Sequence, residues 1–161
     1  MFFLDILKDF FGNYMLVSAI IGWLCAQIIK IFTGWFSHKK LSIKMLFANG
    51  GMPSSHSSTV IALTTACAIQ EGICTPYFAI CGIVSVIVMN DAFGVRYETG
   101  EQSKIINKIV HELFSGSPEE WDTGLKELVG HTPFQVLMGA LLGVLVAFVY
   151  GMIIGQIPLF A

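Results

Sequence analysis

Residues 50–58 read Gly-Gly-Met-Pro-Ser-Ser-His-Ser-Ser, and an apolar run that starts at Thr59 follows them directly. Glycine adopts unusual backbone angles, proline disfavours helix in the residue before it, and serine is a favoured helix N-cap. The pattern therefore predicts a tight turn that leads into a helix. Because a helix start carries unpaired N–H groups and partial positive charge, it suits an anion such as phosphate.

The polar side chains of this stretch can extend such an anion site. The hydroxyls of Ser54 and Ser55 can donate hydrogen bonds, and the imidazole of His56 can carry a proton that moves near neutral pH. A simpler interpretation is that the serines only cap the helix and His56 is a surface residue of its first turn. Taken alone, the stretch does not decide between these interpretations.

The composition indicates an integral membrane protein. Of the 161 residues 55% are hydrophobic and 12% are charged, whereas soluble domains carry roughly 25% charged residues. The start at Met1 lacks the basic segment and the cleavage site of a secretory signal, so we expect the chain to be mature from Met1. Residues 1–161 are expected to form a single membrane-embedded domain. The net charge of −2 gives no reason to expect nucleic acid as a partner.

The apolar stretches predict an all-α fold, a polytopic bundle of about four membrane helices. A short interfacial helix at 1–13 is expected to precede them, and the four membrane helices are expected at 14–36, 59–69, 77–89 and 133–154. The run 59–69 is short and rich in Ala and Thr, which favours a helix buried among the others. With 77–89 it is expected to form a helical hairpin.

Most of the charge lies in residues 91–131. This part of the chain predicts an amphipathic extramembrane helix around Ile105–Leu113, a turn at 115–118 and a second short helix through Leu128. In the resulting topology one side of the membrane carries only Lys8. The other side carries seven basic residues, Lys39, Lys40, Lys44, Arg96, Lys104, Lys108 and Lys126, so the positive-inside rule places it in the cytoplasm.

Lys30 is the one charged residue of its membrane helix. Because a lysine there is costly, it either snorkels to the interface or faces a polar cavity. The four cysteines are interpreted as buried small hydrophobic residues, so neither a disulfide framework nor a metal site nor another cofactor is expected; they are Cys25, Cys67, Cys74 and Cys81.

Three polar clusters are expected at the same side of the bilayer: residues 53–58, 91–102 and 130–133. Two of them are helix starts that carry a histidine, His56 and His131. Two imidazoles, two helix starts and nearby cations form a site that can hold a phosphate and act on it.

These clusters contain three motifs in order: Gly51-Met-Pro-Ser-Ser-His56, Asp91-Ala-Phe-Gly-Val-Arg96 with Gly100 and Gln102, and Leu125-Lys-Glu-Leu-Val-Gly-His131-Thr-Pro. With them the chain resembles, from about Gln27 to Gly143, the divergent membrane branch of the type 2 phosphatidic acid phosphatase and vanadium haloperoxidase superfamily. It implies a helical-bundle phosphatase that works through a covalent phosphohistidine.

By this resemblance His131 is the nucleophile and His56 is the general acid. The expected phosphate-binding residues are Lys30, Ser54, Ser55, Arg96 and Lys126, with Asp91, Glu127 and Gln135 in support. A neutral imidazole attacks phosphorus, cations and N–H groups stabilise the equatorial oxygens, and the second imidazole protonates the leaving alkoxide.

The chain departs from the family pattern at several positions. The pattern has Arg-Pro at 37 and 38, Ser-Arg at 124 and 125, and an acid at 135, where this chain has Ser-His, Gly-Leu and Gln135. The Gln135 amide oxygen can accept from Nδ1–H of His131, but it cannot stabilise an imidazolium as a carboxylate does. In a Ser-His-Asp triad the loss of that charge costs about 10⁴ in rate.

The sequence therefore leaves two functions open. The first is a membrane phosphatase that hydrolyses a lipid phosphate or pyrophosphate. The second is a non-hydrolytic protein that binds or carries phosphorylated lipid, or an assembly partner, and Gln135 with the missing Ser-Arg favours it. The glycine pairs Gly139/Gly143 and Gly151/Gly155 suit close helix packing, within the molecule or in a homodimer.

Overall fold

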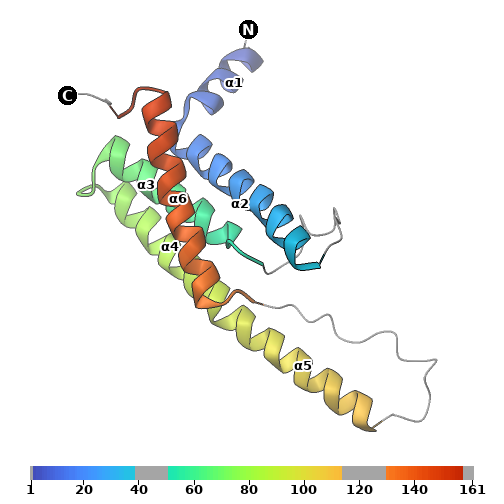
Figure 1. Ribbon diagram of the computed structural model, residues 1–161. Helices are drawn as coiled ribbons and strands as arrows, with labels where there is room; N and C mark the ends of the chain where they lie inside the picture. The colour runs from blue at the N-terminus through green and yellow to red at the C-terminus, as the bar shows by residue number, and fades with distance from the viewer. Residues whose placement is uncertain (1, 39–50, 114–129, 158–161) are drawn as a thin grey trace.

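The structure is a computed structural model that describes residues 2–38, 51–113 and 130–157. In these ranges the regular structure is all helical (Figure 1). The helices are α1 (Phe2–Gly12), α2 (Tyr14–His38), α3 (Ser55–Glu71), α4 (Pro76–Phe93), α5 (Val95–Leu113) and α6 (Pro133–Ile153). The predicted all-α membrane bundle is confirmed, and the predicted turn at 115–118 and helix through 128 lie outside the described residues.

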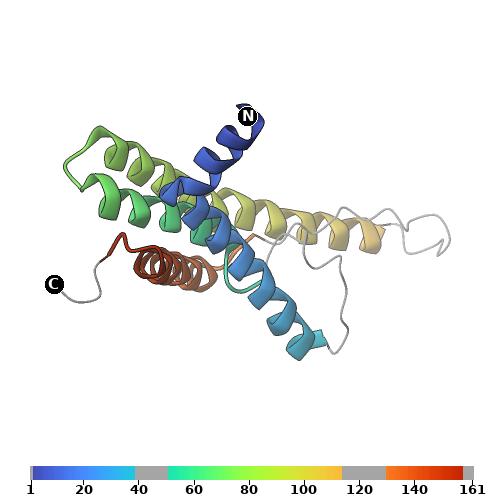
Figure 2. The same ribbon diagram turned by 90° about the horizontal axis from the view of Figure 1, so that it is seen from above.

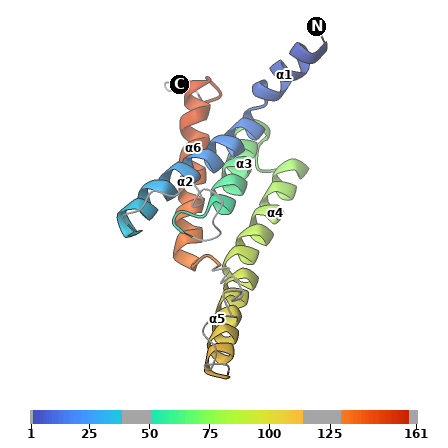
Figure 3. The same cartoon turned by 90° about the vertical axis from the view of Figure 1, so that its right-hand side faces the viewer.

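Three parts of the described chain are long and apolar enough to cross a membrane: Tyr14–Gly34, Pro76–Val110 and Pro133–Ile153. They correspond to α2, to α4 with its continuation in α5, and to α6. The apolar part of the second span is α4, whereas α5 carries charged residues along its length. The remaining predicted membrane helix, at 59–69, corresponds to α3, which has 17 residues and packs against α2, α4 and α6. Figures 1 and 3 show it among these longer helices. As the sequence predicts, it is a helix buried among the others.

Small side chains allow α3 to take this central place. Ala62 and Ala66 are fully buried, and glycines of two neighbouring helices approach the same turn. A Cβ at Gly22 of α2 would lie 3.0 Å from the Ser58 carbonyl oxygen, and one at Gly143 of α6 would lie 2.5 Å from it. Both helices therefore contact α3 backbone to backbone, which is typical of close packing between membrane helices.

The other glycines of α6 also serve contacts within the chain. At Gly139 a Cβ would collide with the Ser54 backbone, and at Gly151 it would meet the Tyr14 hydroxyl at 2.5 Å. Tyr14 is buried there, donates a hydrogen bond to the Ala147 carbonyl at 2.7 Å and stacks on Tyr150. The glycine face of α6 is thus used inside the molecule, and a homodimer stays a prediction.

The helices divide the molecule into two ends. The α3–α4 turn, the start of α2 and the end of α6 lie at one end, and the predicted hairpin of α3 and α4 is present (Figure 1). The start of α3, the end of α4 and the start of α6 lie at the other end. Among the described elements α5 contacts only α4, and it continues beyond the bundle from the end of α4 (Figures 1 and 2).

The surface of the described chain corrects one sequence interpretation. Cys67 is buried, and Cys25 and Cys81 are half-buried, but Cys74 is exposed. The reason is its place in the short turn between α3 and α4, where no described helix covers it. The exposed phenylalanines of α1 fit the predicted interfacial helix, because the same short helix also carries charged residues and buries none of its side chains.

Candidate functional site

The stretch at 50–58 forms, over its described residues 51–58, the turn and helix start that the sequence predicts. Gly51 has a φ of 85°, which favours glycine, and the Met52–Pro53 peptide bond is cis. Ser54 is the N-cap of α3, and its Oγ accepts a hydrogen bond from the Ser57 backbone N–H at 3.4 Å. Ser57 Oγ donates to Ser54 Oγ at 3.1 Å. Ser54 thus caps the helix, which both sequence interpretations expect.

Two further helices hold this turn in place. The Ser54 backbone N–H donates to the Gln135 carbonyl in the first turn of α6 at 3.0 Å. From the other side, Thr33 Oγ1 of α2 donates to the Met52 carbonyl at 2.9 Å. Because α2 and α6 are both membrane-spanning candidates, the start of α3 is fixed between two rigid elements.

Lys30 reaches the same turn from α2. Its side chain is 7% exposed, and its Nζ donates to Ser55 Oγ at 3.3 Å. This resolves the two alternatives for Lys30, because the ammonium faces the helix start instead of snorkelling to the interface. Within the part of the chain that the structure describes, no carboxylate lies within ion-pair distance of it. A buried ammonium in this setting favours the binding of an anion.

His131 is held by a short extended segment just before α6. Its backbone N–H donates to the Ala92 carbonyl at the end of α4 at 3.0 Å. The next residue, Thr132, caps α6 through the Gln135 backbone N–H at 3.4 Å. Gln135 returns a bond, since its Oε1 accepts from the Thr132 backbone N–H at 3.1 Å. Gln135 therefore completes a capping box at the helix start that follows His131.

The two histidines meet at this end of the bundle. Their ring centroids are 6.1 Å apart and the ring planes are nearly perpendicular, at 89°. His131 is 3% exposed and its Nε2 atom is buried, whereas His56 is exposed. Residues far apart in the sequence thus contact each other, and one ring is turned to the interior while the other reaches the surface.

Comparisons with known proteins identify the family. A family model described as "Divergent PAP2 family" matches residues 11–146. The chain belongs to the divergent PAP2 family. A relative from Bacillus subtilis (strain 168), described as "Uncharacterized membrane protein YuiD", is 37% identical over 147 residues, which cover 85% of this chain and 93% of the relative. No solved structure matches.

The structure places the remaining residues that the divergent PAP2 motifs predict as follows. Arg96 lies in the first turn of α5, and Asp91 lies in the last turn of α4, next to the Ala92 carbonyl that holds His131. Lys126 and Glu127 lie outside the described residues. The structure therefore brings together Lys30, Ser54, Ser55, His56, His131 and Gln135 around one helix start.

The sequence did not indicate that three further residues position this site: Thr33, Ala92 and Gly139. Thr33 anchors the Met52 carbonyl, Ala92 anchors the His131 backbone, and Gly139 gives room for the Ser54 backbone. Thr33 lies one helical turn after Lys30, so the two side chains share a face of α2, and this spacing could have predicted the role of Thr33. Among the described residues, no three His, Cys, Asp or Glu side chains are grouped closely enough to hold a metal ion.

Proposed function

We propose that this divergent PAP2 protein is a membrane phosphatase that hydrolyses a lipid phosphate or pyrophosphate. His131 is the nucleophile that forms a phosphohistidine, and His56 is the general acid. Lys30, Ser54, Ser55, Arg96 and Lys126 bind the phosphoryl oxygens. Family membership supports the reaction class, and the contact between the two rings supports the assignment of their roles.

The observation that carries the proposal is the buried Lys30 ammonium on Ser55 Oγ, one residue before His56. An ammonium removed from water needs a counter-charge, and the described residues near it offer hydroxyls and a helix start instead of a carboxylate. A phosphoryl group supplies this charge and can accept from the ammonium and from the hydroxyl. It is also small enough to touch two rings whose centroids lie 6.1 Å apart.

The reaction follows from these positions in two steps. A neutral His131 imidazole attacks phosphorus, the bond from phosphorus to the lipid oxygen breaks, and His56 gives its proton to that oxygen. Water then attacks the phosphohistidine, with the neutral His56 imidazole taking its proton, and inorganic phosphate leaves. Lys30 stabilises the equatorial oxygens in both steps, because it lies at the same helix start throughout.

The test is phosphate release by the purified full-length protein. Phosphatidate, phosphatidylglycerol phosphate and polyprenyl pyrophosphate are offered separately in mixed micelles. We expect release from at least one of them, and we expect His131→Ala and His56→Ala each to abolish it. His111→Ala in α5 is the matched control and should keep the wild-type rate. Activity that survives both site substitutions would overturn the proposal.

A non-hydrolytic binder or carrier of phosphorylated lipid is the second candidate. Gln135 favours it, because its amide oxygen is engaged by the Thr132 backbone N–H in the capping box. It also lacks the charge with which a carboxylate at that position would stabilise an imidazolium. Trapping of a phosphorylated His131 after rapid quench would exclude this candidate, whereas phosphate binding without turnover of any lipid would support it.

A further inference from the structure

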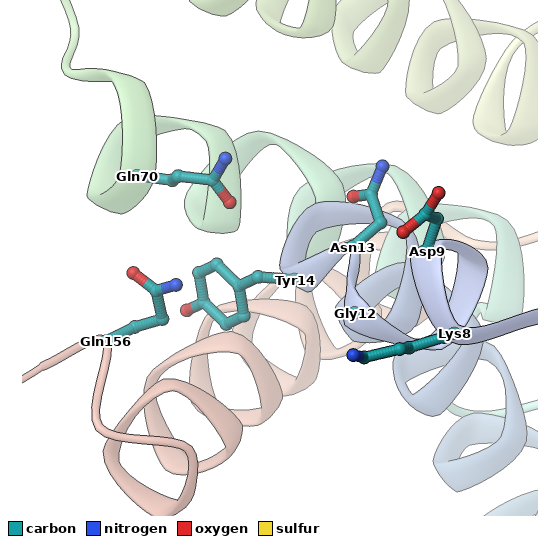
Figure 4. Close-up of a pocket in the computed structure, with 7 residues that line it drawn as sticks. All are labelled: Lys8, Asp9, Gly12, Asn13, Tyr14, Gln70 and Gln156. Carbon is teal, nitrogen blue, oxygen red and sulfur yellow. The ribbon is translucent and has the colours of Figure 1, made fainter. Parts of the chain in front are cut away.

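A second polar site lies at the opposite end of the bundle from the histidines. It is an open pocket of about 560 Å³ between the α1–α2 junction, the end of α3 and the segment after α6 (Figure 4). Ligand pockets typically have volumes of about 300–1,000 Å³. Neither the phosphatase proposal nor the family motifs use this pocket, so its chemistry needs a separate explanation.

The pocket combines opposite charges with carboxamides. Figure 4 shows Lys8, Asp9 and Asn13 on one side and Gln70 and Gln156 on the other, with Tyr14 between them. The Tyr14 hydroxyl is already engaged by the Ala147 carbonyl, and the ring is buried and stacks on Tyr150, so Tyr14 is a fixed part of the lining. The polar contacts for a ligand therefore come from the charged and amide side chains.

Much of this polar capacity is unused within the described chain. Neither Lys8 nor Asp9 forms an ion pair with a described residue, and the Gln156 side chain makes no hydrogen bond there. Gln70, by contrast, donates from its Nε2 to Glu71 Oε1 at 2.8 Å. Asn13 uses its Oδ1 to cap α2 by accepting from the Leu16 N–H at 3.0 Å, which leaves its amide N–H groups as donors. One cation, one anion and several donors complement a ligand that itself carries both charges.

The position of the pocket indicates where such a ligand comes from. It lies where α2 begins, at the end of a membrane-spanning candidate, which is the depth of lipid headgroups. The adjoining helix α1 exposes Phe2, Phe3, Phe10 and Phe11 beside Lys8 and Asp9, as a helix that rests in the membrane surface does. A lipid bound here keeps its acyl chains along α1 while its headgroup enters the pocket.

We propose that this pocket binds the headgroup of a zwitterionic phospholipid that carries a phosphate and a primary amine. Lys8 and the Asn13 amide contact the phosphate, and Asp9 contacts the ammonium group. The proposal is independent of the phosphatase reaction, because the pocket and the histidines lie at opposite ends of the bundle. A purely anionic lipid fits less well, since Asp9 would repel it.

Native mass spectrometry of the purified full-length protein tests this site. The protein is offered equimolar dioleoyl phosphatidylethanolamine and dioleoyl phosphatidylglycerol in detergent. We expect the ethanolamine lipid to be retained about threefold more, the size expected of an interfacial charge contact. Lys8→Gln should weaken retention of both lipids. Asp9→Asn should remove the preference for the ethanolamine lipid, because the carboxylate that repels the anionic lipid is then absent.

Matched controls come from the exposed ion pair Glu101–Lys104 of α5. Lys104→Gln and Glu101→Gln change the net charge as the two pocket substitutions do, and both should keep the wild-type preference. Equal retention of the two lipids by the wild-type protein would overturn the proposal. So would a preference that persists in Asp9→Asn, or unchanged retention of both lipids in Lys8→Gln.

Discussion

Lys30 gives the clearest physical argument at the scale of single residues. Moving an ammonium out of water costs several kcal/mol unless a partner compensates it. In the described structure Ser55 Oγ is a neutral acceptor at 3.3 Å, which compensates only in part. The buried cation therefore lowers the stability of the fold, and a bound phosphoryl group offsets the desolvation cost of the ammonium by supplying a counter-charge. Sites of this kind trade stability for activity.

A Lys30→Met substitution separates the effect of the buried charge on stability from its effect on activity. Removal of the cation should lower the rate of phosphate release by about 10² or more, the usual cost of one donor to the transition state. The free energy of unfolding should be unchanged or higher, because a buried charge is replaced by an apolar chain of similar length. Initial rates and thermal unfolding of the purified protein followed by circular dichroism measure both quantities.

Lys30→Arg is the control, since it keeps the charge and should retain more activity than Lys30→Met. Full activity in Lys30→Met would contradict the role of Lys30 in binding phosphate.

The sequence could predict Lys30 as a site residue only through the family motifs. Hydropathy shows that a charge interrupts the helix, but it does not show the direction of the side chain, and a lysine is long enough to snorkel. The direction depends on Lys30 and Thr33 meeting Ser55 and Met52 across the α2–α3 contact. The contact between His56 and His131 is likewise set by tertiary packing.

At the scale of elements, two helix starts offer a comparison within the same chain. Both α4 and α6 begin with Thr-Pro, and the threonine is the N-cap in each case: Thr75 accepts from the Phe78 N–H and Thr132 accepts from the Gln135 N–H. The two caps differ in their other bonds, because Thr75 Oγ1 also donates to the Gly72 carbonyl at 2.9 Å and Thr132 belongs to a capping box with Gln135. They lie at opposite ends of the bundle. Only Thr132 directly follows His131.

Thr132→Ala and Thr75→Ala should each lower stability by a similar amount, since each removes one N-cap side chain, but they should differ in their effect on activity. Each should lower the free energy of unfolding by about 1 kcal/mol, the typical value of an N-cap side chain. Thr132→Ala should in addition reduce phosphate release, because it loosens the segment that presents His131, while Thr75→Ala should keep the wild-type rate. Denaturation curves and initial rates are measured on the same preparations. Equal rates in the two variants would show that the cap does not position His131.

The contact between α3 and α6 leads to a prediction about packing. Gly143→Ala places a methyl group 2.5 Å from the Ser58 carbonyl oxygen and 2.9 Å from the Ala62 nitrogen. Both atoms belong to the backbone of the central helix and can move little to make room for the methyl group. We therefore expect the free energy of unfolding to fall by about 1–3 kcal/mol. Thermal unfolding in detergent micelles measures this loss.

Gly82→Ala in α4 is the matched control, because no neighbouring atom of the described chain lies within 4 Å of the place that its new methyl group would take. It should leave stability unchanged or raise it by up to about 1 kcal/mol, since alanine is the better helix former. A Gly143→Ala protein as stable as Gly82→Ala would mean that α6 does not contact α3 as described.

The helices themselves could largely be predicted from the sequence. Long apolar runs predict α2, α4 and α6 within a few residues, because hydrophobicity along the chain is a local feature. The partners of the glycine pairs could not be predicted in this way. Gly139 and Gly143 suit a contact inside the molecule as well as one between molecules, and the choice depends on the small side chains of α3, which are far away in sequence.

At the scale of the whole molecule, the two ends of the bundle differ in charge and in chemistry. The histidine end is continued by α5 with its basic residues, and the other end carries Lys8 and the headgroup pocket. By the positive-inside rule we expect the histidine end to face the cytoplasm. A lipid phosphatase in this orientation acts on substrates of the inner leaflet, while the pocket contacts the outer leaflet.

Cys74 allows a direct test of this orientation, because it is exposed in the turn between α3 and α4 at the pocket end. In a protein whose Cys25, Cys67 and Cys81 are replaced by alanine, a membrane-impermeant maleimide should label Cys74 in intact cells. In the matched protein that also carries Cys74→Ala and Ile105→Cys, labelling should require permeabilised cells, since Ile105 is exposed on α5 beyond the other end. Neither set of substitutions changes the net charge, so the topological signal is preserved. The reverse labelling pattern would place the histidines outside the cell, and the substrate would then have to be a phosphorylated lipid of the outer leaflet.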